Sequence, residues 1–295
     1  MRGAKPHADI EGAIARDGIV RAGDRVAIAC SGGADSIALA GLLAAVRATL
    51  DLQLTLAYVH HGTRDSAWQD ECVVLRAGAT FGIPVRVVQL EPDACDESTL
   101  RTARYEALAR VAREVGANAV ATAHHREDQC ETVLLALFRG AGPDGIAGMP
   151  PRRELVPGID LVRPLLQRGV EELRAYCHAQ ALPYAVDPTN ADLGLRRNAV
   201  RAALEALRPL FPGLDAAVAR SAEIVGSELV RSDRATLRRQ VREALDAQEG
   251  LRDVDFVHVE AVVRALERGA SGRFHVRTGV EIVVERGEIA RIDRE

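Results

Sequence analysis

The fold is decided by the segment RVAIACSGGADSIALAGLLAAVRAT, residues 25–49. Its first six residues form a largely apolar run of the kind found in short buried strands, and residues 36–49 carry apolar side chains at helical spacing. Between the two, Gly32 and Gly33 allow the chain to turn tightly. The segment therefore predicts a strand, a glycine-rich turn and a helix.

The same alternation of strand and helix recurs three more times. Strands are expected at 54–60, 84–90 and 118–123, and each precedes an expected helix, at 66–81, 98–115 and 127–138. Four such units indicate a parallel sheet covered by helices on both faces. The predicted fold class is therefore α/β, with a doubly wound, Rossmann-like parallel sheet.

The second half of the chain has a different pattern. Glycine and proline are frequent at 140–168, which we interpret as a functional loop or lid. Helices are expected at 168–181, in a stretch ending near Pro209, and in a long segment from Pro212 to about residue 248. One more helix and short alternating strands fill the last 45 residues. We place a domain boundary near residue 208, with a small helical and α+β domain over 209–295.

The composition excludes several classes of protein. With 47% apolar and 27% charged residues over 295 positions, disorder is not expected. Lys5 is the only lysine, so chemistry that needs a Walker-A lysine or a lysine Schiff base has no candidate in the rest of the chain. The net charge of −4 argues against indiscriminate coating of nucleic acid, although a local basic surface remains compatible with it.

Cysteine usage and hydropathy indicate the compartment. The five cysteines form no CxxC pair, which favours a reducing environment and argues against a zinc or iron–sulfur site. Asp9, Glu11 and Asp17 lie where a signal peptide needs an apolar core, and no apolar run approaches the length of a membrane span. We expect a soluble, cytoplasmic protein without a membrane partner.

The turn after the first strand has the residues of a phosphate-binding loop. It reads Ser31, Gly32, Gly33, Ala34, Asp35, Ser36 and leads directly into a helix. Backbone N–H groups freed by the two glycines, the serine hydroxyls and the helix N-terminus all favour an anion. Because Asp35 would repel phosphate, its expected role is to hold Mg²⁺ between itself and the phosphates. A capped β–α turn without a ligand is the simpler alternative.

A second polar cluster follows the fourth strand. His124 and His125 lie in the turn, and Asp128 and Glu131 are one helical turn apart on the next helix. Ligands of doubly wound sheets bind where the strand order reverses, so the loops after the first and fourth strands are expected to face one crevice. For Glu127 we favour a simple helix-start carboxylate, and Glu131 has the alternative of a solvated surface acid. No convincing third ligand supports zinc.

These motifs carry a family resemblance. SGGADS matches the SGGxDS signature of the PP-loop ATP pyrophosphatases, which cut ATP between its α and β phosphates and adenylate a substrate. Within that superfamily, AHHREDQCETVLLALFRGAGPDGIAGM at 123–149 resembles the tRNA(Ile)-lysidine synthase family more closely than the tRNA thiolases. Supporting segments are HHGTRDS at 60–66, RTARYEAL at 101–108, VRPLL at 162–166 and DPTNADLGLRRNAVR at 187–201. The resemblance covers about residues 25–210 and implies the adenine nucleotide alpha hydrolase-like form of the fold.

The resemblance implies a reaction and a set of partners. The reaction would modify the wobble cytidine in the CAU anticodon of tRNA(Ile): cytosine O2 attacks the α-phosphate of ATP, pyrophosphate leaves, and free L-lysine then displaces AMP from C2. In this scheme the 1–208 domain is the catalytic one. A tRNA thiolase is the nearest alternative, and a nucleotide-binding module without catalysis is the alternative of another class.

The site residues follow from the same matched motifs. Nucleotide and phosphate would be held by Ser31, Gly32, Gly33, Ala34, Asp35, Ser36 and Arg104, and the catalytic candidates are Asp35, Asp128, His124 and Arg201. Asp128 and His124 are the candidates for taking the proton of the incoming ammonium group. The tRNA is expected to contact the C-terminal domain. A basic stripe at helical spacing there consists of Arg231, Arg234, Arg238 and Arg242. Solvated arginines are the simpler explanation of that stripe.

Overall fold

A computed structural model describes residues 8–60, 67–90, 97–185, 196–230, 233–249, 254, 256–277 and 279–294. The chain divides into two compact units. The first consists of residues 1–129 and 150–193, and the second consists of residues 130–149 and 194–295. The sequence predicts a boundary near residue 208 between a catalytic domain and a tRNA-binding domain. That division stays a prediction.

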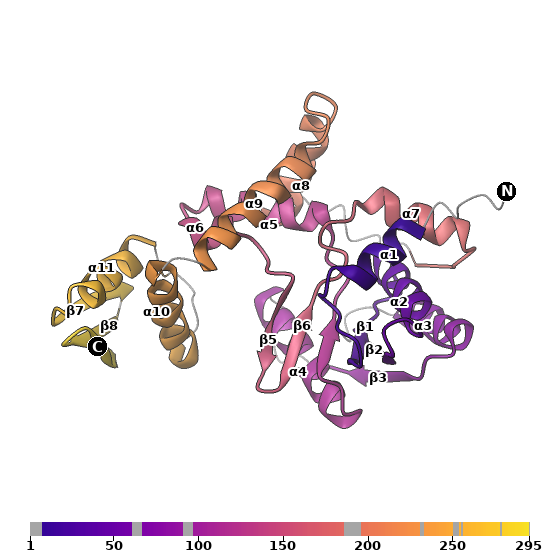
Figure 1. The fold of residues 1–295 in the computed structure, drawn as a ribbon, viewed down its shortest axis with the longest axis horizontal. Helices are drawn as coiled ribbons and strands as arrows, with labels where there is room; N and C mark the ends of the chain where they lie inside the picture. Colours follow the sequence, from indigo (N-terminus) through magenta and orange to yellow (C-terminus); the bar gives the residue numbers. More distant parts are fainter. Residues whose placement is uncertain are drawn as a thin grey trace. The chain divides into compact units, whose positions relative to one another are not determined.

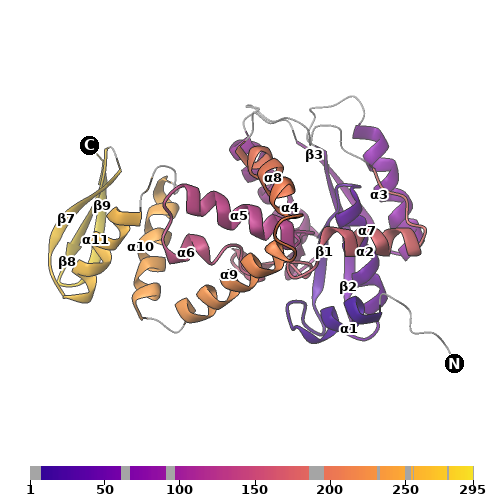
Figure 2. The same ribbon diagram turned by 90° about the horizontal axis from the view of Figure 1, so that it is seen from above.

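The first unit is a sheet with helices on both faces (Figures 1 and 2). Its strands are β1 Arg25–Ala29, β2 Gln53–His60, β3 Val85–Gln89, β4 Ala119–Ala121, β5 Arg152–Val156 and β6 Ile159–Val162. Its helices are α1 Ala8–Arg16, α2 Ala34–Val46, α3 Ala67–Phe81, α4 Glu97–Glu114, the start of α5 Arg126–Phe138, and α7 Val170–Ala179. The strand order is β3-β2-β1-β4-β6-β5. All neighbours are parallel except β5 and β6, so the α/β class is confirmed.

The two faces of the sheet follow from the alternation of side chains along each strand. In β1, Val26 and Ile28 pack with the apolar residues of α1, α2, α3 and α7. Ala27, between them, packs with Leu108 and Val111 of α4 on the opposite face. Because every second residue points the same way, a strand of five residues supplies both cores. The order reverses between β1 and β4, which places the loops after these two strands side by side at one sheet edge.

The interpretation of residues 140–168 as a loop or lid is wrong for much of that range. Residues 152–162 form the β5–β6 hairpin, in which Arg153 pairs with Leu161, and β6 continues the sheet beside β4. Gly158, at φ +79°, makes the turn. The glycines and prolines therefore punctuate short elements, among them α6 Pro143–Ile146, and do not mark a structureless lid.

The second unit contains the rest of α5, α6 and the C-terminal elements. These elements are α8 Arg196–Leu207, α9 Leu214–Val230, α10 Asp233–Glu249, α11 Phe256–Glu267, β7 Gly272–Arg277, β8 Val280–Glu285 and β9 Glu288–Arg294. The expected single helix from Pro212 to about 248 is thus two helices, α9 and α10. The three strands form an antiparallel sheet that shares a core with α10 and α11. Among the described residues, no helix combines the length and apolar character needed to cross a bilayer.

Candidate active site

The loop between β1 and α2 has the form of an anion-binding turn. Gly33 is the N-cap residue of α2, and no side chain among the described residues caps this helix. The Ser36 hydroxyl donates to the Gly33 carbonyl at 2.9 Å, and Ser31 Oγ lies 3.4 Å from Ser36 Oγ. These contacts fix the turn and keep two hydroxyls beside the helix N-terminus. Backbone amides and hydroxyls at such a position are suited to bind phosphate.

Gly32 is required at its position for two reasons. Its φ of +89° lies in the left-handed region that favours glycine. A Cβ at this residue would also lie 3.1 Å from the backbone oxygen of Asp70, in the first turn of α3. The turn can therefore keep this shape only with glycine.

Carboxylates from the first turns of two helices lie close to one imidazole. His125 Nε2 lies 3.6 Å from Asp35 Oδ2 and 3.5 Å from Asp128 Oδ2. Asp35 belongs to the first turn of α2, whereas Asp128 belongs to α5 and also accepts the His125 backbone N–H at 3.1 Å. The crevice predicted between the loops after the first and fourth strands is thus confirmed at the level of side chains. His125, and not His124, is the residue that joins the two acids.

The other side of His125 is held by Glu127. His125 Nδ1 lies 3.0 Å from Glu127 Oε2, and Glu127 Oε2 accepts the Val170 N–H at 3.1 Å. The interpretation of Glu127 as a helix-start carboxylate alone is therefore incomplete, because this side chain also orients the imidazole and binds the start of α7.

The cluster shifts the protonation of its members. Burial lowers the pKa of His125, but the close contact with Glu127 and the charges of Asp128 and Asp35 outweigh it, so the net pKa is raised. Burial raises the pKa of Asp35, and the nearby His125 opposes that shift. Burial also opposes ionisation of Glu127, yet the bond to His125 leaves its pKa lowered. Perturbed pKa values of several adjoining groups are typical of functional sites.

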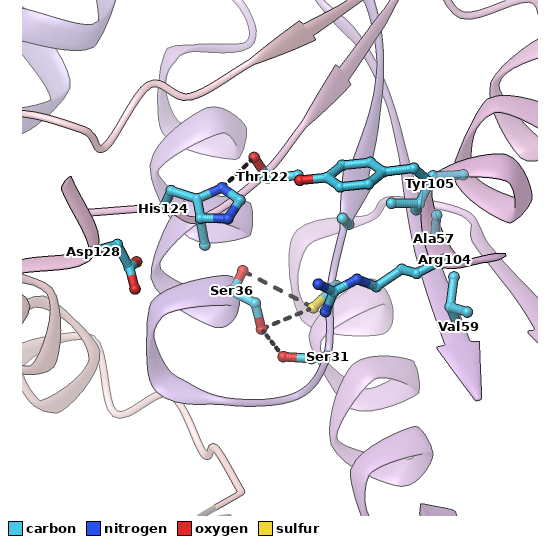
Figure 3. A pocket seen from close by; sticks show the side chains of 13 residues that line it. Ser31, Ser36, Ala57, Val59, Arg104, Tyr105, Thr122, His124 and Asp128 are labelled. Atoms are coloured by element: carbon cyan, nitrogen blue, oxygen red, sulfur yellow. Dashed lines mark hydrogen bonds between the residues drawn. The ribbon is translucent and has the colours of Figure 1, made fainter. Parts of the chain in front are cut away.

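A cavity of about 170 Å³ opens beside this cluster. Figure 3 shows His124, Thr122 and Asp128 on one side of it, Ser31 and Ser36 below, and Arg104 and Tyr105 on the other side. His124 Nδ1 lies 2.9 Å from the Thr122 hydroxyl. Besides Cys30, the rest of the lining is apolar: Ala29, Ala57, Val59, Leu108 and Ala123. Small apolar walls with a few polar groups suit a flat, partly polar ligand such as a nucleobase.

Most of the site residues chosen from the sequence come together here. Ser31, Ser36, Arg104, His124 and Asp128 line the cavity, and Asp35 meets Asp128 through His125. Sequence position does not distinguish His125 from His124, because adjacent residues in a turn differ only in the direction of their side chains. Tyr105, a candidate together with Arg104 for contact with nucleotide or tRNA, also lines the cavity. Asp187 and Asn190, in the matched segment at 187–201, lie outside the described residues.

Arg201 is held by an ion pair in the second unit. Its guanidinium donates to both carboxylate oxygens of Glu131, at 2.8 and 3.2 Å, and Arg197 donates to the same carboxylate at 2.8 Å. Glu131 is only 1% exposed, so the alternative of a solvated surface acid is wrong. A catalytic role for Arg201 stays a prediction, and what the structure shows is a link between α5 and α8.

Replacing Glu131 with alanine is expected to destabilise the second unit by about 2 kcal/mol, because two guanidiniums lose a buried partner. The value lies below that for a fully buried pair since both arginines are partly exposed and can be hydrated. The midpoint of urea-induced unfolding measures the effect. Glu171→Ala is the control, because this 80% exposed acid pairs with Arg174 on the surface and its loss should cost less than about 0.5 kcal/mol. Equal effects of the two substitutions would contradict the prediction.

The basic stripe expected on α10 is not a free surface along its described part. Arg234 donates to Glu260 at 2.8 Å and lies 3.3 Å from Glu267, and Arg238 also donates to Glu260. Glu260 is a buried acid of α11, so these two arginines join α10 to α11. The spacing of the arginines on one helix does not reveal this partner, because it belongs to a different helix. Arg231 lies outside the described residues, and Arg242 stays a candidate for contact with RNA.

The described cysteines differ in burial. Burial, followed by the charge of Asp215, raises the pKa of Cys130 to about 12, and burial followed by Asp35 raises that of Cys177 to about 11. Burial also raises the pKa of Cys30, whereas Cys72 is exposed. Cys95 lies outside the described residues.

In a Cys95→Ser variant, we expect a disulfide reagent at about pH 8 to modify Cys72 alone in the native protein, because reaction needs an accessible thiolate. Peptide mass spectrometry identifies the modified thiol. Addition of Cys72→Ser should remove the fast reaction, and rapid labelling of Cys130 or Cys177 would show that the cores are open.

Comparison with known proteins gives the family. A family model described as a PP-loop domain matches residues 8–207. The tRNA(Ile)-lysidine synthase of Salinispora tropica is 46% identical over 227 residues, which cover 75% of this chain and 66% of the relative. That of Bordetella pertussis is 40% identical over 231 residues, which cover 72% of this chain and 70% of the relative. The enzyme of Geobacter sulfurreducens is 33% identical over 94% of this chain.

A solved structure shares the fold. The U34-tRNA thiolase NcsA of Methanococcus maripaludis superposes with a TM-score of 0.62 at 18% identity, covering 74% of this chain and 78% of that one. The chain spans just under two thirds of the length of the Salinispora and Geobacter relatives. From the family model and the identity to these relatives, the chain belongs to the PP-loop domain family and, within it, to the family of tRNA(Ile)-lysidine synthases.

Proposed function

We propose that this protein joins L-lysine to C2 of the wobble cytidine in the CAU anticodon of tRNA(Ile), with ATP converted to AMP and pyrophosphate. The observation that carries the proposal is the meeting of Asp35 and Asp128 at His125, beside a cavity lined by the loop serines. The names of the curated relatives support the choice of tRNA and lysine as substrates.

In the first step, cytosine O2 attacks the α-phosphate of ATP and pyrophosphate leaves. The amides and hydroxyls of residues 31–36 would hold the departing pyrophosphate, since α2 lacks a side-chain cap among the described residues. Arg104 would meet the negative charge from the opposite wall, and the apolar lining would take the base. This arrangement stabilises charge where it develops and leaves little covalent chemistry to the protein.

Asp35 fits the role of a magnesium ligand. Its Oδ1 is buried and has no hydrogen-bond partner in the described part of the chain, as expected of an oxygen kept for a cation. The described residues hold no group of three or more His, Cys, Asp or Glu side chains suited to a metal ion. Mg²⁺ does not require one, because it commonly takes one or two carboxylates and completes its shell with water and phosphate oxygens. When bound, the ion would neutralise charge on the phosphates.

In the second step, the amine of lysine displaces AMP from C2. The ammonium group must first lose a proton, and an acceptor within hydrogen-bond reach is needed. Asp128 and His124 both line the cavity and are the two acceptors that we propose. His125 orients Asp128 by two contacts with Asp128 Oδ2. The imidazole Nε2 lies 3.5 Å from this oxygen, and the His125 backbone N–H donates to it at 3.1 Å. We retain Arg201 as a further catalytic candidate and residues 209–295 as the part that contacts tRNA.

The proposal is tested by measuring pyrophosphate release from ATP with tRNA(Ile) transcript present or omitted and with lysine present or omitted. Release should need the tRNA, and lysidine should form only when lysine is added. A nucleotide-binding module without catalysis would bind ATP and release no pyrophosphate. A thiolating enzyme would release pyrophosphate with tRNA yet form no lysidine. Either of these results would overturn the assignment.

A further inference from the structure

Arg163 is a buried arginine directly after β6. It is 2% exposed, and its Nη1 donates to the Pro150 carbonyl at 2.6 Å. Its Nε is buried and has no hydrogen-bond partner among the described residues. A buried charge is costly unless it is paired and hydrogen-bonded. Packing alone would therefore be served better by an apolar side chain at this position.

Arg152, at the start of the hairpin that precedes Arg163, shows how a partly buried arginine is usually accommodated. Its guanidinium donates to Asp160 at 2.7 Å and lies 3.4 Å from Asp24, so two carboxylates compensate its charge. Within the described ranges, Arg163 forms no ion pair with a carboxylate. The groups that act on it electrostatically are Tyr105 and two further cations, Arg153 and Arg101. The charge of Arg163 is thus left uncompensated by this part of the chain.

Arg163 lies behind the wall of the nucleotide cavity. The residue before it, Val162, accepts the N–H of Thr122, whose side chain lines the cavity. The Arg163 guanidinium is also hydrogen-bonded to Tyr105, another lining residue, and Arg101 lies over the same tyrosine ring at 5.4 Å. Burial lowers the pKa of Arg163 to about 10, which still leaves it protonated at neutral pH. A fixed positive charge is therefore held one side chain away from the cavity.

We propose that Arg163 sets nucleotide specificity: from behind the cavity wall, its charge, which pairs with no carboxylate of the described residues, favours the polyphosphate nucleotide over uncharged nucleosides. Such a charge needs no contact with the ligand, because electrostatic interactions extend through a protein interior of low effective dielectric constant. The ligand itself supplies the missing negative charge. This inference rests on the proposed function, since it takes the cavity to be the ATP site.

The test compares the affinities of ATP and adenosine, measured by calorimetry with excess magnesium, in the wild type and in Arg163→Met. The ratio of the two affinities should fall on the order of tenfold, as for one unit charge removed at roughly 12 Å through a medium of effective dielectric constant about 20. Adenosine affinity should change by less than about twofold. A purely structural role would lower both affinities together and leave the ratio unchanged, and that result would overturn the proposal.

Two further variants complete the experiment. Arg163→Lys keeps the charge and should keep the wild-type ratio of ATP to adenosine affinity. This variant also tests the proposal if Arg163→Met fails to fold. A lower ratio in a folded Arg163→Lys protein would contradict the proposal. Arg152→Met is the matched control, because it removes an arginine whose charge is already paired. It should lower the unfolding temperature without changing the ratio. If wild-type protein binds neither ATP nor adenosine, the proposed function fails, and this outcome differs from an unchanged ratio.

Discussion

Replacing Asp35 with alanine is expected to abolish tRNA-dependent release of pyrophosphate, with a loss of at least about a thousandfold, while the protein stays folded. Asp35 lies in the first turn of α2, and its side chain is 35% exposed, so it contributes little to the core. Its Oδ1 has no hydrogen-bond partner among the residues that the structure describes, which leaves it available for a cation at the phosphates. Without this carboxylate, charge on the phosphates would be compensated by the loop amides and hydroxyls alone.

The measurement is the rate of pyrophosphate release, with circular dichroism and thermal unfolding to establish that the variant is folded. Asp9→Ala is the matched control, because Asp9 is also an acid in the first turn of a helix but is exposed on α1. It should keep wild-type activity. Near-normal release by folded Asp35→Ala would remove the basis for assigning the cation to this residue.

Replacing Asp128 with asparagine is expected to slow lysidine formation by at least roughly a hundredfold, which is the lower range for acid–base groups. The amide has the size of the carboxylate and can still accept the His125 backbone N–H through its oxygen, so the turn should keep its shape. What is lost is a negative group that can take a proton. Single-turnover assays that follow AMP release and lysidine separately distinguish the second step from the first.

Glu127→Gln is the comparison for Asp128→Asn. Glu127 also contacts His125, but at Nδ1, and its carboxylate is engaged with the N–H of Val170. Loss of its charge should reduce the rate by less than about tenfold, since such a residue orients the imidazole and receives no proton from substrate. If the two variants were equally active, Asp128 would be only a helix-start carboxylate.

The sequence predicted those parts of the site that depend on short segments. The strand, turn and helix at 25–49 require only local spacing. The position of the site follows from the rule that ligands of a doubly wound sheet bind where the strand order reverses. The β5–β6 hairpin was missed because Arg152, Arg153 and Glu154 weaken its apolar pattern. Its formation depends on the free edge of β4, which local sequence does not reveal.

Ion pairs between residues far apart in the chain also cannot be predicted from local sequence. Glu131 meets Arg197 and Arg201, which lie 66 and 70 residues further along the chain. Helical spacing shows which residues share a face of a helix, but it does not show what that face meets. For the same reason the spacing of Arg234 and Arg238 indicates a surface stripe, whereas their acid partner belongs to α11.

The division of each compact unit into two stretches of sequence also governs the order in which the protein can fold during synthesis. When the ribosome has made residues 1–129, strand β4 still lacks its neighbour β6, which is made only after residues 130–149 have been added to the second unit. Cys130, within that added segment, must in turn wait for Val200 and Leu204 to complete its core. Neither unit can therefore finish folding before about two thirds of the chain has emerged, and a nascent chain of intermediate length carries an open sheet edge.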